Sequence, residues 1–180
     1  EGVKMMREVA RQAALKPYYE ELGLEPTQAP AGPNRRPFGA QVAEVLERLC
    51  PAVVSFHFGL PTPELLARVK RLGAKVLSTA TTVEEALWLQ ARGADAVIAQ
   101  GLEAGGHRGH FLSTDISAQM DTLTLVSRCA SALGIPVIAA GGIGDAAGVR
   151  AAMARGAAAV QVGTAFLLSE EAATGALHRA

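Results

Sequence analysis

Two glycine-rich stretches hold residues that could bind a phosphate and move a proton. The first is Gln100-Gly-Leu-Glu-Ala-Gly-Gly-His-Arg-Gly109, and the second is Pro136-Val-Ile-Ala-Ala-Gly-Gly-Ile-Gly144, which is followed by Gln161-Val-Gly-Thr164. Each begins with apolar residues and breaks into glycine where a strand is expected to end. Glycine permits φ > 0 and leaves room for a ligand close to main-chain N–H groups.

The later two segments predict a phosphate site. Gly-Gly-Ile-Gly144 ends a strand and opens a helix at Asp145, where free N–H groups and the helix dipole favour an anion. The next strand leads into Gly163 and the Thr164 hydroxyl. Ligand-free tight turns are the alternative, but two neighbouring glycine-ended strands favour a phosphate. The full G-x-G-x-x-G spacing and the later acidic residue of a dinucleotide site are missing. Flavin mononucleotide (FMN), with one phosphate, therefore suits the site better than NAD.

The first stretch supplies candidates for chemistry. The Gln100 amide can both donate and accept, so it could read the edge of a flavin ring. His107 is suited to act as a general base near neutral pH. A loop histidine is more often merely solvated, but its place beside two glycines after a strand favours catalysis. His57 closes another strand, where it either lines a substrate pocket or packs between aromatic rings. His110 is expected to face solvent.

Five short apolar runs alternate with helical patterns and would position these stretches. Strands are expected at residues 52–56, 75–78, 96–99, 136–140 and 159–162, and helices at 62–72, 82–92, 121–133 and 145–155. Equivalent positions in successive units lie 22, 22, 40 and 22 residues apart. Parallel strands need helical crossovers, so this repetition predicts a parallel sheet covered on both faces. Thr62, Thr82 and Asp145 are typical helix N-caps, and the glycines expected to end helices are Gly73, Gly93, Gly134 and Gly156.

The first fifty residues give a weaker pattern. Residues 3–22 look helical, although Pro17 is expected to break or start an element there. Residues 23–37 hold four prolines and indicate a loop, and residues 38–49 form another amphipathic helix. We interpret residues 1–180 as a single domain with about five βα units. A doubly wound sheet would be complete at five strands, whereas a (β/α)8 barrel needs eight, so its first three strands would lie outside this sequence.

Composition excludes several classes of protein. The 17 basic and 17 acidic residues cancel, and no basic stripe or aromatic platform indicates nucleic acid. A mean hydropathy of +0.21 indicates a globular chain, and no apolar run approaches the roughly 18 residues of a membrane span. Cys50 and Cys129 lack a metal-like spacing, so neither a metal site nor a disulfide scaffold is expected. No signal peptide is visible, and a reducing cytoplasm fits best.

Taken together, the motifs resemble the nitronate monooxygenase family, formerly called 2-nitropropane dioxygenases. The likeness rests on residues 103–109, 136–144 and 161–166, together with Val53-Val-Ser-Phe-His-Phe-Gly-Leu-Pro61. It implies an FMN-dependent (β/α)8 TIM-type barrel that oxidises alkyl nitronates, and neutral nitroalkanes, with molecular oxygen. The chain would then hold about the last five βα units of the barrel. The family's earlier strands, which carry further flavin contacts, are absent from it.

The resemblance also implies roles for individual residues. His107 matches the histidine that the family uses as catalytic base on neutral nitroalkanes, and His57 is a candidate substrate contact. The expected FMN-binding residues are Gln100, Gly105, Gly106, Gly141, Gly142, Gln161, Val162, Gly163 and Thr164. The expected partners are a small nitronate and O2, without nucleic acid, membrane or metal, and the oligomeric state is not indicated.

Two other functions stay open. A flavin-dependent enoyl-acyl-carrier-protein reductase shares the barrel and a similar Gly-Gly-His-x-Gly segment, but it takes hydride from a reduced nicotinamide. The segment Ser55-Phe-His-Phe-Gly59 favours the monooxygenase. The second alternative is a barrel fragment that holds FMN or another phosphate without turnover.

Overall fold

The computed structural model describes residues 13–21, 23, 37–175 and 179. The chain divides into two compact units, Glu1–Pro37 and Phe38–Ala180. In the first unit, residues 13–21 are helical and Pro17 does not interrupt the helix, contrary to the expectation that an element breaks or starts there. The rest of the helix expected at 3–22, and nearly all of the loop expected at 23–37, lie outside the described residues.

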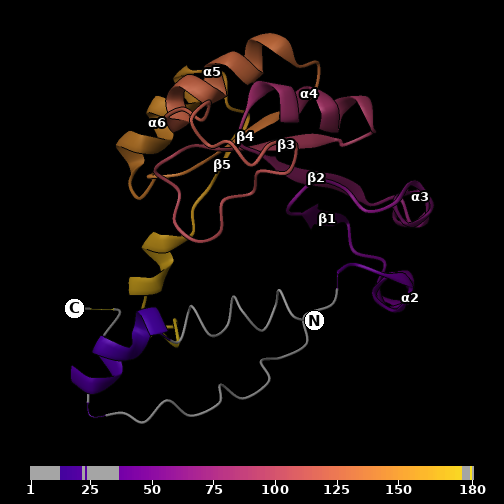
Figure 1. Ribbon diagram of the computed structural model, residues 1–180. Coiled ribbons are helices and arrows are strands. Elements are labelled where there is room, and N and C mark those ends of the chain that lie inside the picture. Colours follow the sequence, from indigo (N-terminus) through magenta and orange to yellow (C-terminus); the bar gives the residue numbers. More distant parts are fainter. Residues whose placement is uncertain (1–12, 22, 24–36, 176–178, 180) are drawn as a thin grey trace. The chain divides into compact units, whose positions relative to one another are not determined.

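The second unit alternates strands and helices as the sequence predicts (Figure 1). The order is α2 (Ala40–Leu49), β1 (Val53–Phe56), α3 (Pro63–Arg71), β2 (Lys75–Ala80), α4 (Val83–Ala91), β3 (Ala96–Gln100), α5 (Thr122–Ala132), β4 (Val137–Ala140), α6 (Ala146–Ala154), β5 (Ala159–Gln161) and the 3₁₀ helix η1 (Thr164–Leu168). The expected bounds differ from these by no more than two residues at either end. Within the described residues, no helix has the length and apolar character needed to span a membrane.

The five strands form one parallel sheet in the order β1-β2-β3-β4-β5. Each strand therefore pairs with its neighbours in the chain, through pairs such as Phe56 with Ser78 and Gln100 with Ala140. A doubly wound sheet reverses its strand order at a switch point, whereas a (β/α)8 barrel keeps consecutive strands adjacent. The observed order is that of a barrel, and it decides between the two architectures that the sequence left open.

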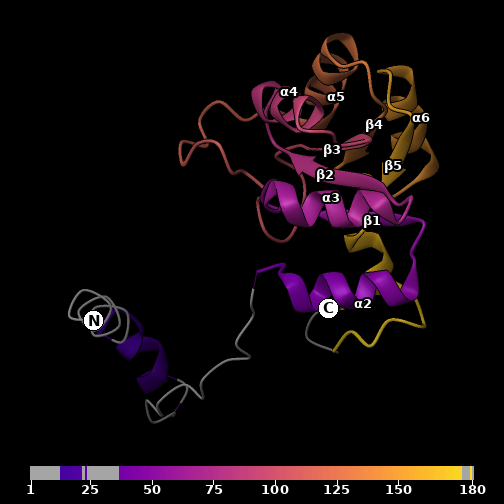
Figure 2. The ribbon, with the colours of Figure 1, turned by 90° about the vertical axis from the view of Figure 1, so that its right-hand side faces the viewer.

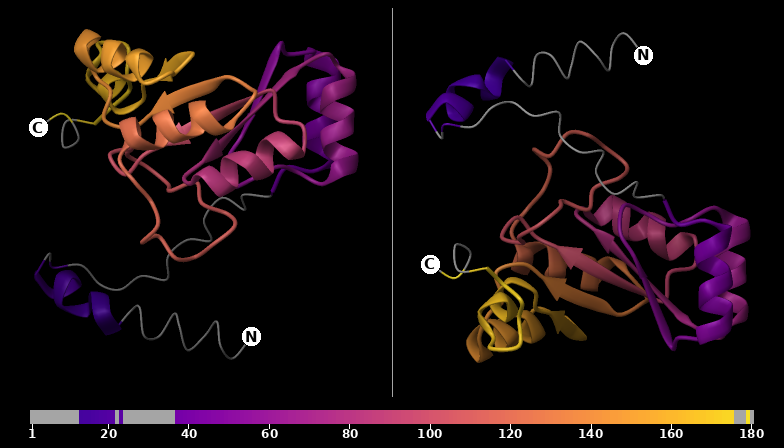
Figure 3. Two further views of the ribbon diagram at one scale, coloured as in Figure 1. Left: turned by 90° about the horizontal axis from the view of Figure 1, so that it is seen from above. Right: turned by 90° about the horizontal axis from the view of Figure 1, so that it is seen from below.

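The helices lie in two groups against the sheet. Helices α4, α5 and α6 cover one face (Figure 1), and α3 lies along the strands near α2 (Figure 2). Seen from above, α4 and α5 cross in front of the strands, while α2 and α3 lie beside the β1 edge (Figure 3, left). This arrangement leaves the carboxyl ends of all five strands at one edge of the sheet, where their loops meet.

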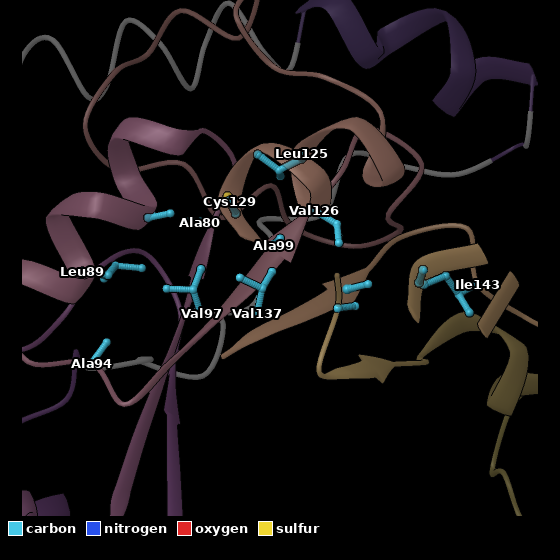
Figure 4. Packing of buried hydrophobic residues seen from close by; sticks show 14 residues of the cluster. Ala80, Leu89, Ala94, Val97, Ala99, Leu125, Val126, Cys129, Val137 and Ile143 are labelled. Atoms are coloured by element: carbon cyan, nitrogen blue, oxygen red, sulfur yellow. The ribbon is translucent and has the colours of Figure 1, made fainter. Parts of the chain in front are cut away.

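The hydrophobic core fills the space between the sheet and helices α4 and α5 (Figure 4). Leu89 of α4 and Leu125, Val126 and Cys129 of α5 are fully buried. They meet the outward side chains of the central strands, which are Ala80, Val97, Ala99, Val137 and Ala139. A second, smaller cluster lies under α2 and α3 and includes Leu66, Val69 and Val76. Burial of this apolar surface fixes the strands that carry the candidate site.

Burial differs between the middle and the edges of the sheet. All five residues of β3 are buried, as expected for a strand covered on both faces. No residue of β1 or β5 is buried, and Val53 is 52% exposed. The expectation of complete coverage is therefore wrong for the two outer strands. The reason is that, in the described part of the chain, each of them pairs with a single neighbouring strand.

Most of the predicted helix caps are confirmed. The side chains of Thr82 and Asp145 accept N–H bonds in the first turns of α4 and α6, and Gly73, Gly93 and Gly156 follow their helices with positive φ. Thr62 stands at the N-cap position of α3 without a side-chain bond. The prediction for Gly134 is wrong.

Helix α5 ends on an extended residue, Leu133, so no left-handed glycine is needed there. Instead, the N–H of Gly134 donates to Gln90 Oε1 at 2.7 Å.

The two cysteines are free, and their burial predicts different reactivities. Cys50 is exposed, whereas Cys129 is buried in α5. Burial, with a smaller effect from Glu84, raises the pKa of the Cys129 thiol to about 12. At pH 8 we expect Cys129 to react roughly a thousandfold more slowly than a thiol with the ordinary pKa of 9.0.

The measurement uses Cys50→Ser and Cys129→Ser variants with a thiol reagent, under native conditions and in denaturant. The denatured thiols should react alike. Equal native rates for the two variants would contradict the packing of α5 against the sheet.

Candidate functional site

The register of the sheet places two predicted cofactor residues, Gln100 and Gln161, in one row with Ala140. Gln100 pairs with Ala140, and Ala140 pairs with Gln161. Paired residues of adjacent strands point to the same face of a sheet. Gln100, Ala140 and Gln161 therefore lie side by side at the carboxyl ends of β3, β4 and β5, on the face opposite α4 and α5.

A cavity of about 400 Å³ opens at this row. Seven of the predicted cofactor residues line it: Gln100, Gly105, Gly141, Gly142, Gln161, Gly163 and Thr164. The other lining residues are Ile143 and Gly144, which belong to the predicted phosphate segment, and Glu103, Ala104, Ala140 and Ala165, which the sequence did not single out as ligand contacts. The volume falls within the range of small-molecule and cofactor sites. The three glycine-rich segments thus meet around one space.

Two glycines of the cavity wall are held closely against neighbouring segments. Gly142 has a φ of +64°, and a Cβ there would lie 2.9 Å from Glu103 Cβ. A Cβ on Gly105 would lie 2.9 Å from the Thr164 hydroxyl oxygen. Side chains at these positions would force the segments apart. Glycine is therefore required for the approach of the two walls, and bare main chain is left facing the cavity.

The start of α6 contributes less to this cavity than the sequence predicted. The carboxylate of Asp145 caps its own helix by accepting the Gly148 N–H at 2.7 Å. The cavity wall is formed by residues 141–144, just before that helix, and by residues 163–165 at the start of η1. The first turn of a helix leaves N–H groups without intrahelical partners, so the start of η1 can offer donors to an anion.

The loop between β3 and α5 (residues 101–121, the β3–α5 loop) carries His107, whose side chain is exposed. The Gln100 side-chain amide bonds to the main chain of residues 107–109. Its Nε2 donates to the His107 carbonyl oxygen at 3.0 Å, and its Oε1 accepts the Gly109 N–H at 2.7 Å. Gln100 is only 8% exposed. It both lines the cavity and fixes the main chain beside His107.

His107 does not line the cavity, and three further predicted site residues also lie outside its lining. His57 bonds to Thr79 and to the His107 carbonyl oxygen through its two ring nitrogens. The side chain of Val162 packs against the hydrophobic core, so only its main chain is available to a ligand. Gly106 has a φ of +76°, and a Cβ there would meet no atom within 4 Å, which marks it as a turn residue of the β3–α5 loop.

Two charged side chains of the β3–α5 loop bond to the main chain near its ends. Arg108 donates to the carbonyl oxygens of Gly101 and Leu102. Glu103 accepts the N–H and hydroxyl of buried Thr122, at 2.8 and 2.7 Å. Glu103 and Arg108 therefore bond to different partners, and both hold the main chain at the two ends of the loop.

The expectation that His110 faces solvent is wrong. The residue is half-buried, and its Nδ1 is buried without a hydrogen-bond partner among the described atoms. Its neighbour Phe111 packs on Trp88 of α4, with ring centroids 5.1 Å apart, so this part of the loop lies against the helix.

Sequence reasoning missed Glu85, the residue that fastens the β3–α5 loop to α4. It is 2% exposed. One carboxylate oxygen accepts from the N–H and hydroxyl of Thr81, at 2.7 and 2.8 Å. The other accepts from the N–H groups of Phe111 and Leu112, at 2.6 and 3.2 Å. The spacing of Thr82 and Glu85 matches a capping box, which was the available signal. The bond from Glu85 to Phe111, 26 residues later, cannot be predicted from any short motif around Glu85.

Comparison with known proteins identifies relatives of this chain. A sequence model described as nitronate monooxygenase matches residues 5–180. A nitronate monooxygenase of Pseudomonas aeruginosa is 51% identical over 129 residues, covering 72% of this chain and 37% of that protein. A nitronate monooxygenase of Paraburkholderia phytofirmans is 43% identical, covering 87% of this chain and 43% of that protein. This chain thus spans less than half the length of these curated relatives.

Two solved structures are also similar to this chain. Nitroalkane oxidase from Streptomyces ansochromogenes superposes with a TM-score of 0.71 at 47% identity, covering 76% of this chain and 40% of that one. A mutant of FabK from Thermotoga maritima gives a TM-score of 0.67 at 37% identity, covering 77% of this chain and 43% of that one.

The contacts of Glu85 lead to a stability prediction. In a Glu85→Gln variant, an amide NH2 would replace one carboxylate oxygen and face N–H donors, which leaves buried donors unpaired. We expect the free energy of unfolding to fall by about 1–3 kcal/mol. Glu84→Gln, the same change at an exposed position of the same helix, should stay within about 0.5 kcal/mol of the unsubstituted chain.

Urea unfolding followed by Trp88 fluorescence measures both variants. Trp88 is the single tryptophan and touches the β3–α5 loop through Phe111. If the two variants were equally stable, Glu85 would not anchor the loop.

Proposed function

The chain belongs to the nitronate monooxygenase family, by its match over residues 5–180, and on that premise we propose that it forms the FMN- and base-bearing part of an enzyme that oxidises alkyl nitronates with molecular oxygen. Neutral nitroalkanes would be substrates after loss of a proton to His107. The observation that carries the proposal is the meeting of three glycine-rich segments around one cavity, with His107 on the loop held by a cavity residue.

The residues of the cavity are suited to FMN. Its wall at 141–144 and 163–165 is nearly free of bulky side chains, so main-chain N–H groups can approach a phosphate closely. The hydroxyl of Thr164 adds a further donor. Gln100 and Gln161 stand on the strands that lead into the cavity, and their amides could bond the polar edge of a flavin ring. The same donor set suits one phosphate group, which supports FMN over a dinucleotide.

Bound FMN would supply the electron acceptor for the nitronate and the group that passes electrons on to oxygen. The residues of this chain would bind FMN and remove a proton from a neutral nitroalkane. His107, exposed beside the anchored main chain, would accept a proton from the carbon next to the nitro group. Gln100 would keep the histidine at a fixed distance from the cavity, because the same side chain contacts both. A substrate that arrives as the nitronate anion has already lost that proton and does not need the base.

The proposed setting is the cytoplasm. Both cysteines are free, which accords with a reducing compartment.

The FMN proposal predicts the effect of a methyl group on the cavity wall. In a Gly142→Ala variant, strain at positive φ and contact with Glu103 should weaken FMN binding by about tenfold, equivalent to roughly 1.4 kcal/mol. Gly134→Ala is the matched control, because its Cβ would meet nothing closer than 3.8 Å and it lies outside the cavity. Titration followed by flavin fluorescence gives both affinities. Equal affinities for the two variants would argue against this wall as the FMN site.

The base assigned to His107 predicts a substrate-dependent loss of rate. In a His107→Ala variant, kcat/KM for a neutral nitroalkane should fall by about 10²–10⁴-fold, while bound FMN changes little. The rate with a preformed nitronate should fall far less. His110→Ala, three residues away on the same loop, serves as the control. Oxygen uptake is measured with each substrate, without nicotinamide.

Two results would overturn parts of this proposal. An unchanged rate on the neutral nitroalkane would remove His107 as the base. Turnover that requires a reduced nicotinamide and ignores nitronates would favour the reductase activity instead.

A further inference from the structure

His57 has both ring nitrogens bonded to other parts of the protein. It directly follows β1, one position beyond the pair formed by Phe56 and Ser78, so it stands beside Thr79 of β2. Its Nδ1 lies 3.0 Å from the Thr79 hydroxyl oxygen. Its Nε2 lies 3.2 Å from the carbonyl oxygen of His107, 50 residues later in the chain. The ring therefore links the end of the sheet to the main chain of His107.

The chemistry of the two partners fixes the direction of these bonds. A carbonyl oxygen can only accept, so Nε2 of His57 must carry the proton that it shares with His107. In the neutral ring, Nδ1 then accepts from the Thr79 hydroxyl. Thr79 is 5% exposed, which gives its hydroxyl few competing partners. The His107 carbonyl thus fixes the tautomer with the proton on Nε2, and the Thr79 hydroxyl satisfies the other ring nitrogen as its donor.

The same carbonyl receives a second donor. Gln100 Nε2 approaches the His107 oxygen at 3.0 Å, and Gln100 Oε1 accepts the Gly109 N–H at 2.7 Å. A carbonyl oxygen has two lone pairs, and here His57 and Gln100 use both. The main chain of residues 107–109 is therefore held by two side chains from two different strand ends, β1 and β3.

The β3–α5 loop also packs closely against the His57 ring. A Cβ on Gly109 would lie 2.6 Å from His57 Cε1 and 2.8 Å from Thr79 Cγ2. Only glycine allows the loop to come so near. The His57 ring also packs edge-on against Phe58, with centroids 4.3 Å apart, and Phe58 holds an unusual φ of +67°. The loop and Phe58 thus contact the ring, while His57 stays partly open to solvent as an exposed residue.

We propose that His57 is a positioning residue, which donates from Nε2 to the His107 carbonyl and thereby sets where the His107 imidazole stands. We propose this role in place of the substrate contact that the sequence predicted for His57. The link to catalysis rests on the proposed function of His107 as the base, but the hydrogen-bond network itself does not.

Two substitutions of His57 test its two hydrogen bonds separately. The amide nitrogen of Gln reaches about as far as histidine Nε2, so His57→Gln keeps a donor for the His107 carbonyl. The amide of Asn reaches only as far as Nδ1, so His57→Asn keeps a partner for Thr79 and loses the donor to the loop. Thr79→Val, which keeps the shape of Thr79 and removes its hydroxyl, is a further variant that leaves His57 in place.

The first readout is amide hydrogen exchange at Gly109, measured by NMR on the full chain. We expect exchange to quicken about three- to tenfold in His57→Asn and in Thr79→Val, the effect of losing one hydrogen bond. His57→Gln should restore slow exchange. Equal exchange in the Asn and Gln variants would overturn the proposal. Should His57→Asn fail to fold, Thr79→Val against the unsubstituted chain decides the question.

The second readout is the ratio of kcat/KM for a neutral nitroalkane to that for its nitronate, with FMN bound. A misplaced base should lower this ratio by about 10- to 100-fold in His57→Asn, and His57→Gln should recover it. A rise in KM for both substrates with unchanged exchange would mean that His57 touches substrate, which contradicts the proposal. If the unsubstituted chain oxidises neither substrate, the proposed function fails, and the exchange result alone still decides the role of His57.

Discussion

The site depends on how side chains satisfy the main chain of one long loop. The β3–α5 loop, residues 101–121, has no strand or helix to pair its polar groups, and unpaired groups near the core are costly. Buried Glu85 takes up the N–H groups of Phe111 and Leu112. Gln100 and Glu103 bond Gly109 and Thr122. Without these contacts neither His107 nor the Glu103–Gly105 wall of the cavity would have a defined position.

Gln100 joins the two halves of the proposed chemistry. It belongs to the most buried strand, β3, and its amide reaches the loop on one side and the cavity on the other. In a (β/α)8 barrel the carboxyl ends of the strands carry the reacting groups, while the strands themselves give rigidity. Here the buried side-chain amide of Gln100 bonds the loop to the rigid strand β3. The base proposed on this loop would stay near the proposed cofactor site, although His107 does not line the cavity.

The fold was largely predictable from the sequence, and the site was predictable in part. Strand and helix bounds follow from local apolar runs, caps such as Asp145 and glycines such as Gly93, all of which act within a few residues. The glycine-rich segments are also local signals, and seven of the predicted cofactor residues line one cavity. Long-range partners could not be foreseen. Glu85 meets Phe111 across 26 residues and His57 meets His107 across 50. The contact of Gly134 with Gln90, 44 residues earlier, was equally invisible, and α5 ends on extended Leu133 rather than on a left-handed glycine.

The central claim is that residues 141–144 and 163–165 hold the phosphate of FMN. The most direct measurement compares the binding of FMN and riboflavin, which differ only in that phosphate, by calorimetric titration of this chain. If main-chain N–H groups hold the phosphate, FMN should bind at least about a hundredfold more tightly than riboflavin, because a phosphate accepts several charge-assisted hydrogen bonds. Equal affinity for the two flavins, or no binding of either, would contradict the account.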